Sequence, residues 1–357
     1  MAARWRTIAV LVCVFKILLI TLLPPIPSPW GDLWNWAYGA AICLGYLERG
    51  HFPTVAATGI YGPLELVLVP FYWLWTKLPI EHPAVETIGY LYSNTTPARF
   101  LVILLNVPLV LADIATGLLV LKLVKRLTQS DVRSKLAFLL WYANPYNVYI
   151  TNVYSAMDVI PTSIFLLALI LAYESKWFRC GLYVSFAAIL RVFSLITVPF
   201  LILGARTKAT RMRSSLLSGV LLPLLLGLLL VFTTGAATLE GIATIPQREF
   251  WLLDFLGPSL ISQYVRLAPY LVALQLGVCI CLWKKRNLLH LATVSLLALT
   301  VGTLPFGGGG KHFLWVSPLL TICLALNPDE LWVFVLTFFA AALLDGWPAF
   351  PVGANPR

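Results

Sequence analysis

Long runs of apolar residues constrain this chain more than any other feature. The run Leu216–Phe232 is typical, because it contains no charged residue. A helix that crosses a bilayer needs roughly 20 apolar residues, with about 17 to 25 as the usual range. Charged residues make up 11% of the chain, against about 25% in ordinary soluble domains. The sequence therefore predicts an all-α, polytopic membrane protein.

The apolar runs predict about eleven transmembrane helices in a single integral membrane domain, residues 1–357. One apolar run, Tyr61–Leu78, is assigned instead to a helix that lies at the outer surface. Counting it as a span would move the basic loop after Leu121 to the outside. The expected spans centre on Thr7–Leu23, Phe100–Leu121, Leu136–Ile150, Val159–Tyr173, Phe178–Leu190, Val192–Leu203, Ser215–Phe232, Leu267–Trp283, Leu288–Val301, Phe313–Leu326 and Leu331–Leu344.

Basic residues fix the orientation. Most of the 25 lysines and arginines fall in short loops on one side, which the positive-inside rule places in the cytosol. The net charge of +10 is thus explained by topology, and a nucleic-acid partner is not expected. The outer side receives a long first loop with interfacial helices, residues 24–99, and a second loop, residues 233–266. The membrane is the endoplasmic reticulum in a eukaryote and the plasma membrane in an archaeon or bacterium.

Asp32 is the leading candidate for chemistry. It stands in "PSPWGDLWNWAYGA", among tryptophans that include Trp34. Partial desolvation at a membrane surface raises the pKa of a carboxyl group towards the range of a general base, and aromatic rings stack on the apolar faces of a sugar. The alternative is an N-cap of the helix that follows.

Asp113 lies in the middle of an expected span, within "LLNVPLVLADIATGLLVL". A charge there costs roughly 2.5 to 3.5 kcal/mol on insertion scales and normally faces a partner inside the bundle. Lys16 and Arg191 are the available cations. We expect a structural ion pair or hydrogen bond between helices.

Asp158 and Arg191 fall at outer ends of expected spans. Asp158 closes the polar stretch "NPYNVYITNVYSAMD", in which Asn152 and its neighbours can hydrogen-bond a polyol; the alternative is a polar loop that caps the next helix. Arg191 can hold a lipid-linked phosphate in a low-dielectric groove, or it can snorkel to the surface.

Further candidates border the outer loops. Lys311 and His312 follow four glycines, Gly307–Gly310, and glycine backbone plus an adjacent cation is a pattern that cradles phosphate; a flexible link is the alternative. Arg248 is a weaker candidate for substrate binding. Asp32 is followed by Leu33 and Trp34, so a metal-binding DxD pair is missing and no metal ligand is assigned.

Several short segments, taken in order, resemble a GT-C superfamily glycosyltransferase, and most closely the glycosylphosphatidylinositol mannosyltransferase I family. The segments are "GDLWNWAYGA", "GIYGPLELVL", "LADIATGLLVLKL", "LLWYANPYNVYITNVYSAMDVIPTSI", "AAILRVFSLITVPFLI" and "KHFLWVSPLL". They touch most of the first two hundred residues and one late loop.

The resemblance implies transfer of a hexose, mannose in that family, from a polyprenyl (dolichyl) phosphate donor to a glycolipid or lipid-linked oligosaccharide, with inversion. Asp32 would be the base, and Arg191, Lys311 and His312 would bind the donor phosphate. Trp34, Tyr61, Asn152, Asp158 and Arg248 would bind substrate. No cofactor is expected to be obligatory, and the missing second acid leaves a divalent metal open. Membrane lipids and an unidentified small subunit are the other partners considered; a non-catalytic lipid or lipid-linked-sugar flippase or scramblase is the alternative function.

Overall fold

The computed structural model shows a mostly helical protein, and the residues that it describes contain no β-strand. Those residues are 2–22, 32–50, 63–80, 82, 96–148, 150–151, 155–191, 194, 197–204, 209–234, 289, 292–293 and 313–327.

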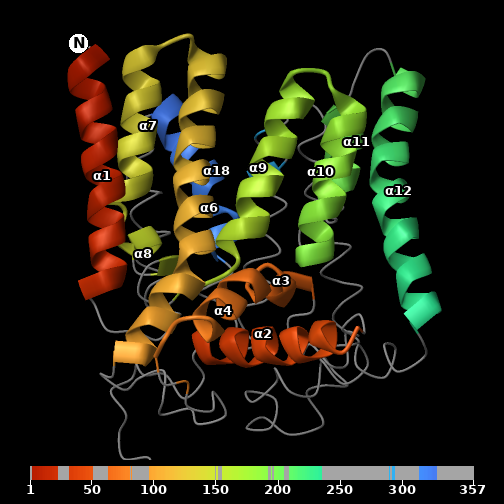
Figure 1. Ribbon diagram of the computed structural model, residues 1–357. Helices are drawn as coiled ribbons and strands as arrows, with labels where there is room; N and C mark the ends of the chain where they lie inside the picture. Colours follow the sequence, from red (N-terminus) through yellow and green to blue (C-terminus); the bar gives the residue numbers. More distant parts are fainter. Residues whose placement is uncertain are drawn as a thin grey trace, which may run out of the picture.

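Most of the described helices run side by side in one bundle (Figure 1). α6 packs on α7, α9 packs on α10, and α10 packs on α12, while α6 also contacts α1, α9 and α18. The bundle therefore has α6 near its centre. Its members are α1 (Ala2–Leu22), α6 (Thr96–Thr128), α7 (Asp131–Ala143), α9 (Val159–Tyr173), α10 (Trp177–Leu190), α11 (Val198–Gly204), α12 (Ala209–Thr234) and α18 (Ser317–Leu326).

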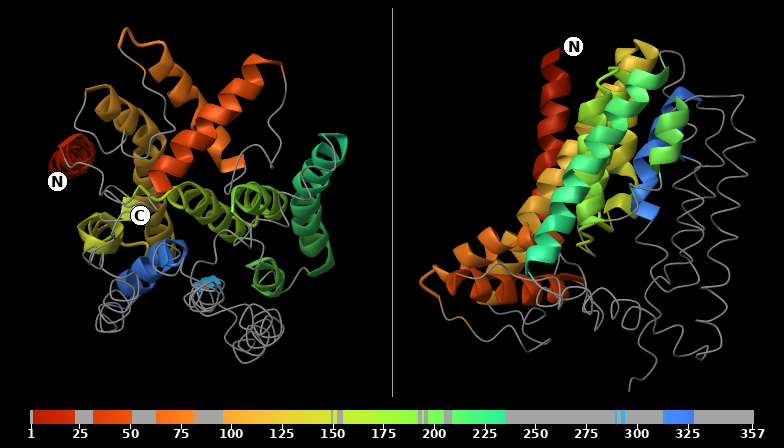
Figure 2. Two further views of the ribbon diagram at one scale, coloured as in Figure 1. Left: turned by 90° about the horizontal axis from the view of Figure 1, so that it is seen from below. Right: turned by 90° about the vertical axis from the view of Figure 1, so that its right-hand side faces the viewer.

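Three helices lie across one end of this bundle. They are α2 (Asp32–Glu48), α3 (Pro63–Leu66) and α4 (Val69–Thr76), and Figure 2 shows α2 crossing beneath the upright helices. α2 packs on α3 and α4, and α4 packs on α6. The sequence run that was assigned to a surface helix forms the two short helices α3 and α4, which are far below the length that a span requires.

α6 is the one described helix that is both long enough and apolar enough to cross a membrane, judged by length and composition. Its 33 residues continue through Pro108. The described helices α9, α10 and α18 are apolar but shorter. Several expected spans, among them Leu267–Trp283 and Leu331–Leu344, lie outside the described residues, so the number of about eleven spans remains a prediction.

The end of the bundle opposite α2 carries basic residues. α6 ends there with Lys125 and Arg126 in its last turn. The turn from α9 to α10 brings Glu174 to the same end, where it pairs with Arg126 and, at 2.6 Å, with Nζ of Lys176. The two hydrogen bonds lower the pKa of Glu174 to about 2. Basic residues from α6 and from the turn between α9 and α10 therefore gather at this end.

α10 and α12 approach each other through glycine. A Cβ atom on Gly219 would lie 2.2 Å from the carbonyl oxygen of Phe178, and one on Gly181 would lie 2.3 Å from the carbonyl oxygen of Leu216. Ser185 donates a hydrogen bond of 2.7 Å to the carbonyl oxygen of Val220 across the same contact. Bare backbone at both glycines thus sets the spacing of these two helices.

Around its apolar core, the bundle also buries charged side chains. The side chains of Lys16 and Asp113 are each 1% exposed, and Asp158 is fully buried. The outer faces of the same helices expose large apolar side chains. These include Val10, Leu11, Val14, Phe15, Ile17, Leu18, Leu111, Leu118, Leu217, Leu221, Leu222 and Leu225.

Candidate functional site

Asp158 and Arg191 form an ion pair at the end of the bundle that faces α2. Nε of Arg191 lies 3.1 Å from Oδ1 of Asp158. α10 ends at Leu190, and Arg191 follows in extended conformation with its N–H still bonded to the carbonyl oxygen of Ala187. The side chain of Arg191 is 17% exposed, so the pair sits just beneath the surface of the described structure.

The carboxylate of Asp158 does not cap the helix that it precedes. It occupies the N-cap position of α9 but makes no side-chain capping bond. Instead its Oδ1 accepts a hydrogen bond of 3.0 Å from Nε1 of Trp315, in the short 3-10 helix η4 (Phe313–Trp315). The side chain of Asp158 therefore joins α9, the end of α10 and η4.

Trp36 brings α2 to the same place. The Cζ atom of Arg191 lies 6.0 Å from the centroid of the Trp36 ring, within the range of a cation–π interaction. Trp36 is fully buried. Asp32 is the first residue of α2, one helical turn before Trp36, and residues four apart lie on the same face of a helix. Through Trp36, α2 thus contacts the Asp158–Arg191 pair.

A second carboxylate is buried against α2. Glu65 of α3 is 1% exposed, and its Cδ atom would lie 2.2 Å from a Cβ on Gly39. α3 contacts both α2 and α10. The sequence analysis did not single out Glu65, and the glycine one turn after Trp36 was the signal that a side chain from another segment approaches α2 there.

The other predicted site residues lie wholly or partly outside what the structure describes. Trp34 belongs to α2, but its side chain, like that of Asp32, lies outside what the structure describes. The same holds for every atom of Tyr61, Asn152, Arg248, Lys311 and His312. Of the predicted set, the structure brings Asp158 and Arg191 together. It adds Trp36, one of the tryptophans near Asp32 that was given no site role, and Trp315, which sequence reasoning missed.

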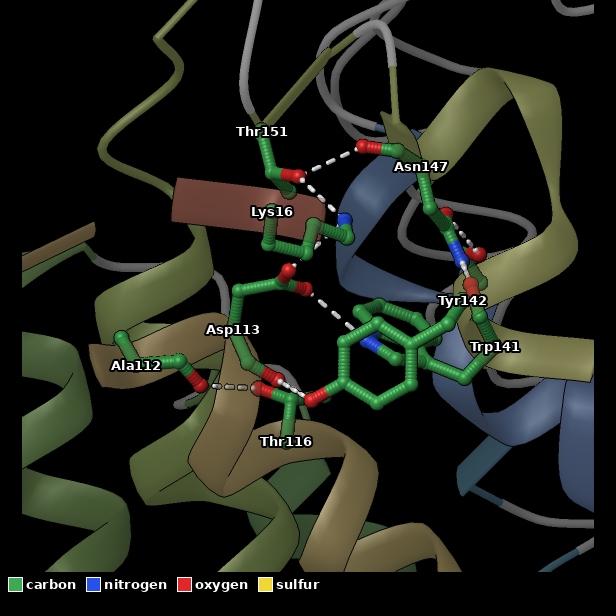
Figure 3. Close-up of polar contacts among 9 residues, drawn as sticks. Lys16, Ala112, Asp113, Thr116, Trp141, Tyr142, Asn147 and Thr151 are labelled. Atoms are coloured by element: carbon green, nitrogen blue, oxygen red, sulfur yellow. Dashed lines mark hydrogen bonds and ion pairs between the residues drawn. The ribbon is translucent and has the colours of Figure 1, made fainter. Parts of the chain in front are cut away.

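A separate polar network lies inside the bundle (Figure 3). Nζ of Lys16 on α1 lies 2.8 Å from Oδ2 of Asp113 on α6, and Oδ1 of Asp113 accepts a hydrogen bond of 2.9 Å from Nε1 of Trp141 on α7. The Tyr142 hydroxyl donates to the carbonyl oxygen of Asp113 at 3.2 Å. The expectation that Asp113 pairs with a cation between helices is confirmed, and Lys16 is that cation.

The described residues contain no group of three or more His, Cys, Asp and Glu side chains arranged to hold a metal ion. Comparison of the chain with models of known protein families and with curated proteins gave no match. What this site can do therefore has to be argued from its own residues.

Proposed function

We propose that this chain is a membrane-embedded glycosyltransferase, which transfers a hexose, mannose, from a polyprenyl-phosphate donor to a glycolipid or lipid-linked acceptor. The observation that carries the proposal is the convergence on Arg191. The helix that begins with Asp32 presents Trp36 to its guanidinium, Asp158 binds its Nε, and Trp315, which follows Lys311 and His312 in the sequence, binds Asp158.

Charge balance supports an anionic donor. The Asp158–Arg191 pair is neutral as a unit, and a sugar phosphodiester adds one negative charge. Lys311 and His312 supply positive charge in the segment that leads to Trp315. Arginine binds phosphate through a planar fork of N–H donors, and Asp158 fixes the plane of that fork. In this proposal Asp158 is a positioning residue and Arg191 contacts the phosphate.

The chemistry requires one base. Asp32 takes the proton of an acceptor hydroxyl as the hydroxyl oxygen attacks the anomeric carbon from the face opposite the phosphate. The new carbon–oxygen bond forms, the bond from the anomeric carbon to the phosphate oxygen breaks, and the polyprenyl phosphate leaves with the electron pair. The configuration of the sugar is inverted. Stacking on Trp34 would orient the ring.

Buried charge together with exposed apolar side chains supports a membrane setting. Buried charge inside the bundle and large apolar side chains on its outer faces are the arrangement that a lipid solvent favours. We propose that the chain crosses the bilayer several times. The basic end would face the cytosol, and α2, α3 and α4 would lie at the opposite, non-cytosolic surface.

Sugar transfer by the purified protein is the decisive experiment. Synthetic polyprenyl-phosphate mannose is compared with the corresponding glucose donor over a range of glycolipid acceptors, with EDTA present and absent. We expect mannose transfer that survives EDTA, and a fall of about 10²- to 10⁴-fold in Asp32→Asn, the usual range for loss of a general base. Glu48→Gln, an exposed acid at the other end of α2, is the matched control and should retain activity.

The rival function predicts a different pattern. A flippase or scramblase moves lipid-linked sugar without a base, so lipid movement in reconstituted vesicles would survive Asp32→Asn. Folded wild-type protein that transfers no sugar from any lipid-linked donor, yet moves lipid across vesicles, would replace the glycosyltransferase proposal with that one.

A further inference from the structure

We propose that the buried Lys16–Asp113 ion pair is a positioning device for the donor site, which fixes Trp315, Asp158 and Arg191 from the far side of the bundle. The expected effect on kinetics rests on the proposed function. The positioning itself rests on a continuous set of contacts between the ion pair and these residues. Neither residue has a role in the proposed chemistry.

The contacts begin at Lys16 and run along the polar stretch after α7. Nζ of Lys16 lies 3.4 Å from Oγ1 of Thr151, and Thr151 donates a hydrogen bond of 2.6 Å to the carbonyl oxygen of Asn147. Figure 3 shows Lys16 between Asp113 on one side and Thr151 and Asn147 on the other. The lysine thus holds both α6 and the segment that leads on to Asp158.

The side chain of Asn147 carries the contact onward. Nδ2 of Asn147 donates to the carbonyl oxygen of Trp141 at 3.1 Å, while Oδ1 accepts a bond of 2.7 Å from the hydroxyl of Ser317. Ser317 begins α18 two residues after Trp315, whose indole binds Asp158. Ser317 and Trp315 therefore connect the buried ion pair to the Asp158–Arg191 pair.

The position of α1 depends on this lysine. Among the α1 side chains that the structure describes, Lys16 is the one that is buried. α1 packs mainly on α6 and stands at the edge of the bundle (Figure 2). Most of its described apolar side chains are exposed, and Val12 is the one that packs against the core, so apolar contacts do little to fix its register on α6. A directional ion pair can do so.

Stability alone is a poor explanation for the pair. Two charges lose their hydration when they are buried, and replacement of a buried ion pair by apolar residues of similar volume is often neutral or stabilising. What apolar residues cannot reproduce is the set of directions that Asp113 and Lys16 impose on Trp141 and Thr151. Function, rather than folding, should therefore suffer when the pair is replaced.

The test uses the double variant Lys16→Met/Asp113→Leu, which leaves no unpaired charge. We expect it to fold, with a melting temperature at or above that of the wild type. Its KM for polyprenyl-phosphate mannose should rise about tenfold, with kcat within a factor of about three, because Arg191 is displaced while Asp32 stays in place. Ser317→Ala should raise KM in the same direction and add nothing further in the double variant, since residues in one network are not additive.

Thr321→Val is the matched control on α18. Thr321 is buried like Ser317, but its hydroxyl bonds the backbone of its own helix at 2.9 Å. It should leave KM unchanged. A double variant with wild-type KM and kcat would overturn the inference and leave the pair with a purely structural role.

A second readout separates this inference from the proposed function. The indole ¹⁵N–¹H resonance of Trp315, assigned by its loss in Trp315→Phe, reports the hydrogen bond to Asp158 in full-length protein in micelles. It should shift in the double variant and in Ser317→Ala, and stay in Thr321→Val. If wild-type protein transfers no sugar but this pattern holds, the proposed function fails and the positioning stands. If sugar is transferred and the resonance does not move, the positioning fails.

Discussion

The carboxylate of Glu65 fills the space beside Gly39 where a methyl group would have to go. The distance from Cδ of Glu65 to a Cβ on Gly39 would be 2.2 Å, and both carboxylate oxygens would lie within 2.6 Å of it. Because Glu65 is almost completely buried, its side chain cannot simply rotate into solvent. The helix that begins with Asp32 is thus seated on α3 at a position that only glycine fits.

Gly39→Ala should therefore weaken the packing of α2. We expect a loss of about 1–3 kcal/mol in the free energy of unfolding, the usual cost of overpacking, and a fall in sugar transfer as α2 moves. Gly45→Ala on the same helix is the control, because nothing lies within 4 Å of its new Cβ. It should stabilise by about 0.5–1 kcal/mol. Denaturant unfolding in detergent measures both, and equal effects of the two variants would show that Glu65 does not constrain α2.

Gly219→Ala tests the contact of α10 with α12. The new methyl group would meet the carbonyl oxygen of Phe178 at 2.2 Å, and backbone cannot move aside as a side chain can. We expect a loss of about 1–3 kcal/mol or more, measured as a lower denaturation midpoint. Unchanged stability would mean that the two helices separate at little cost.

Arg191→Lys and Asp158→Asn test the donor site. Lysine keeps the charge of Arg191 but loses the planar fork, so we expect KM for the donor to rise about tenfold with stability nearly unchanged. Asp158→Asn removes the charge partner of a largely buried guanidinium and should cost about 2 kcal/mol of stability as well as raising KM. Donor saturation curves and thermal unfolding measure the two effects. An Arg191→Lys variant with wild-type KM would remove Arg191 from the donor site.

Glu174→Gln gives a pH-dependent prediction. The pKa of Glu174 is lowered to about 2 by hydrogen bonds from Lys176 and Arg126, whereas an unfolded glutamate titrates near about 4.3. The stabilisation is therefore complete above about pH 4.3 and is lost as the pH falls towards 2. Wild-type protein should melt at a higher temperature than Glu174→Gln at pH 7, and the two should converge only below about pH 2. A difference that does not depend on pH would point to packing rather than charge.

Some features of this structure were predictable because one charged residue in an apolar setting allows few arrangements. A carboxylate in the middle of an apolar helix needs a partner, which is why the sequence predicted a cation for Asp113, either Lys16 or Arg191; the structure shows Lys16. The end of a helix at Arg191 was predictable because this charged residue stands between two apolar runs. The segment Tyr61–Leu78 was assigned to a helix at the outer surface because of the arrangement of the basic loops, and its described part forms the short helices α3 and α4.

Other features depend on tertiary packing that no local pattern encodes. Asp158 precedes the first residue of α9, and Arg191 follows the last residue of α10. Their contact depends on how the turn at Glu174 folds α10 back on α9. Trp315 reaches Asp158 from a distant part of the chain, and nothing near Trp315 in the sequence announces a partner. Glu65 was one acid among several in a long loop until its contact with Gly39 singled it out.

The buried lysine of α1 has a consequence for how the chain is made. In the proposed membrane setting, α1 leaves the ribosome before α6 exists, and its central ammonium has no carboxylate to neutralise it. A lone lysine at that depth opposes partitioning into lipid, so α1 should stay near the insertion machinery until Asp113 arrives. One salt bridge then sets the order in which these two helices enter the bilayer. α1 enters fully only when Asp113 on α6 pairs with its lysine.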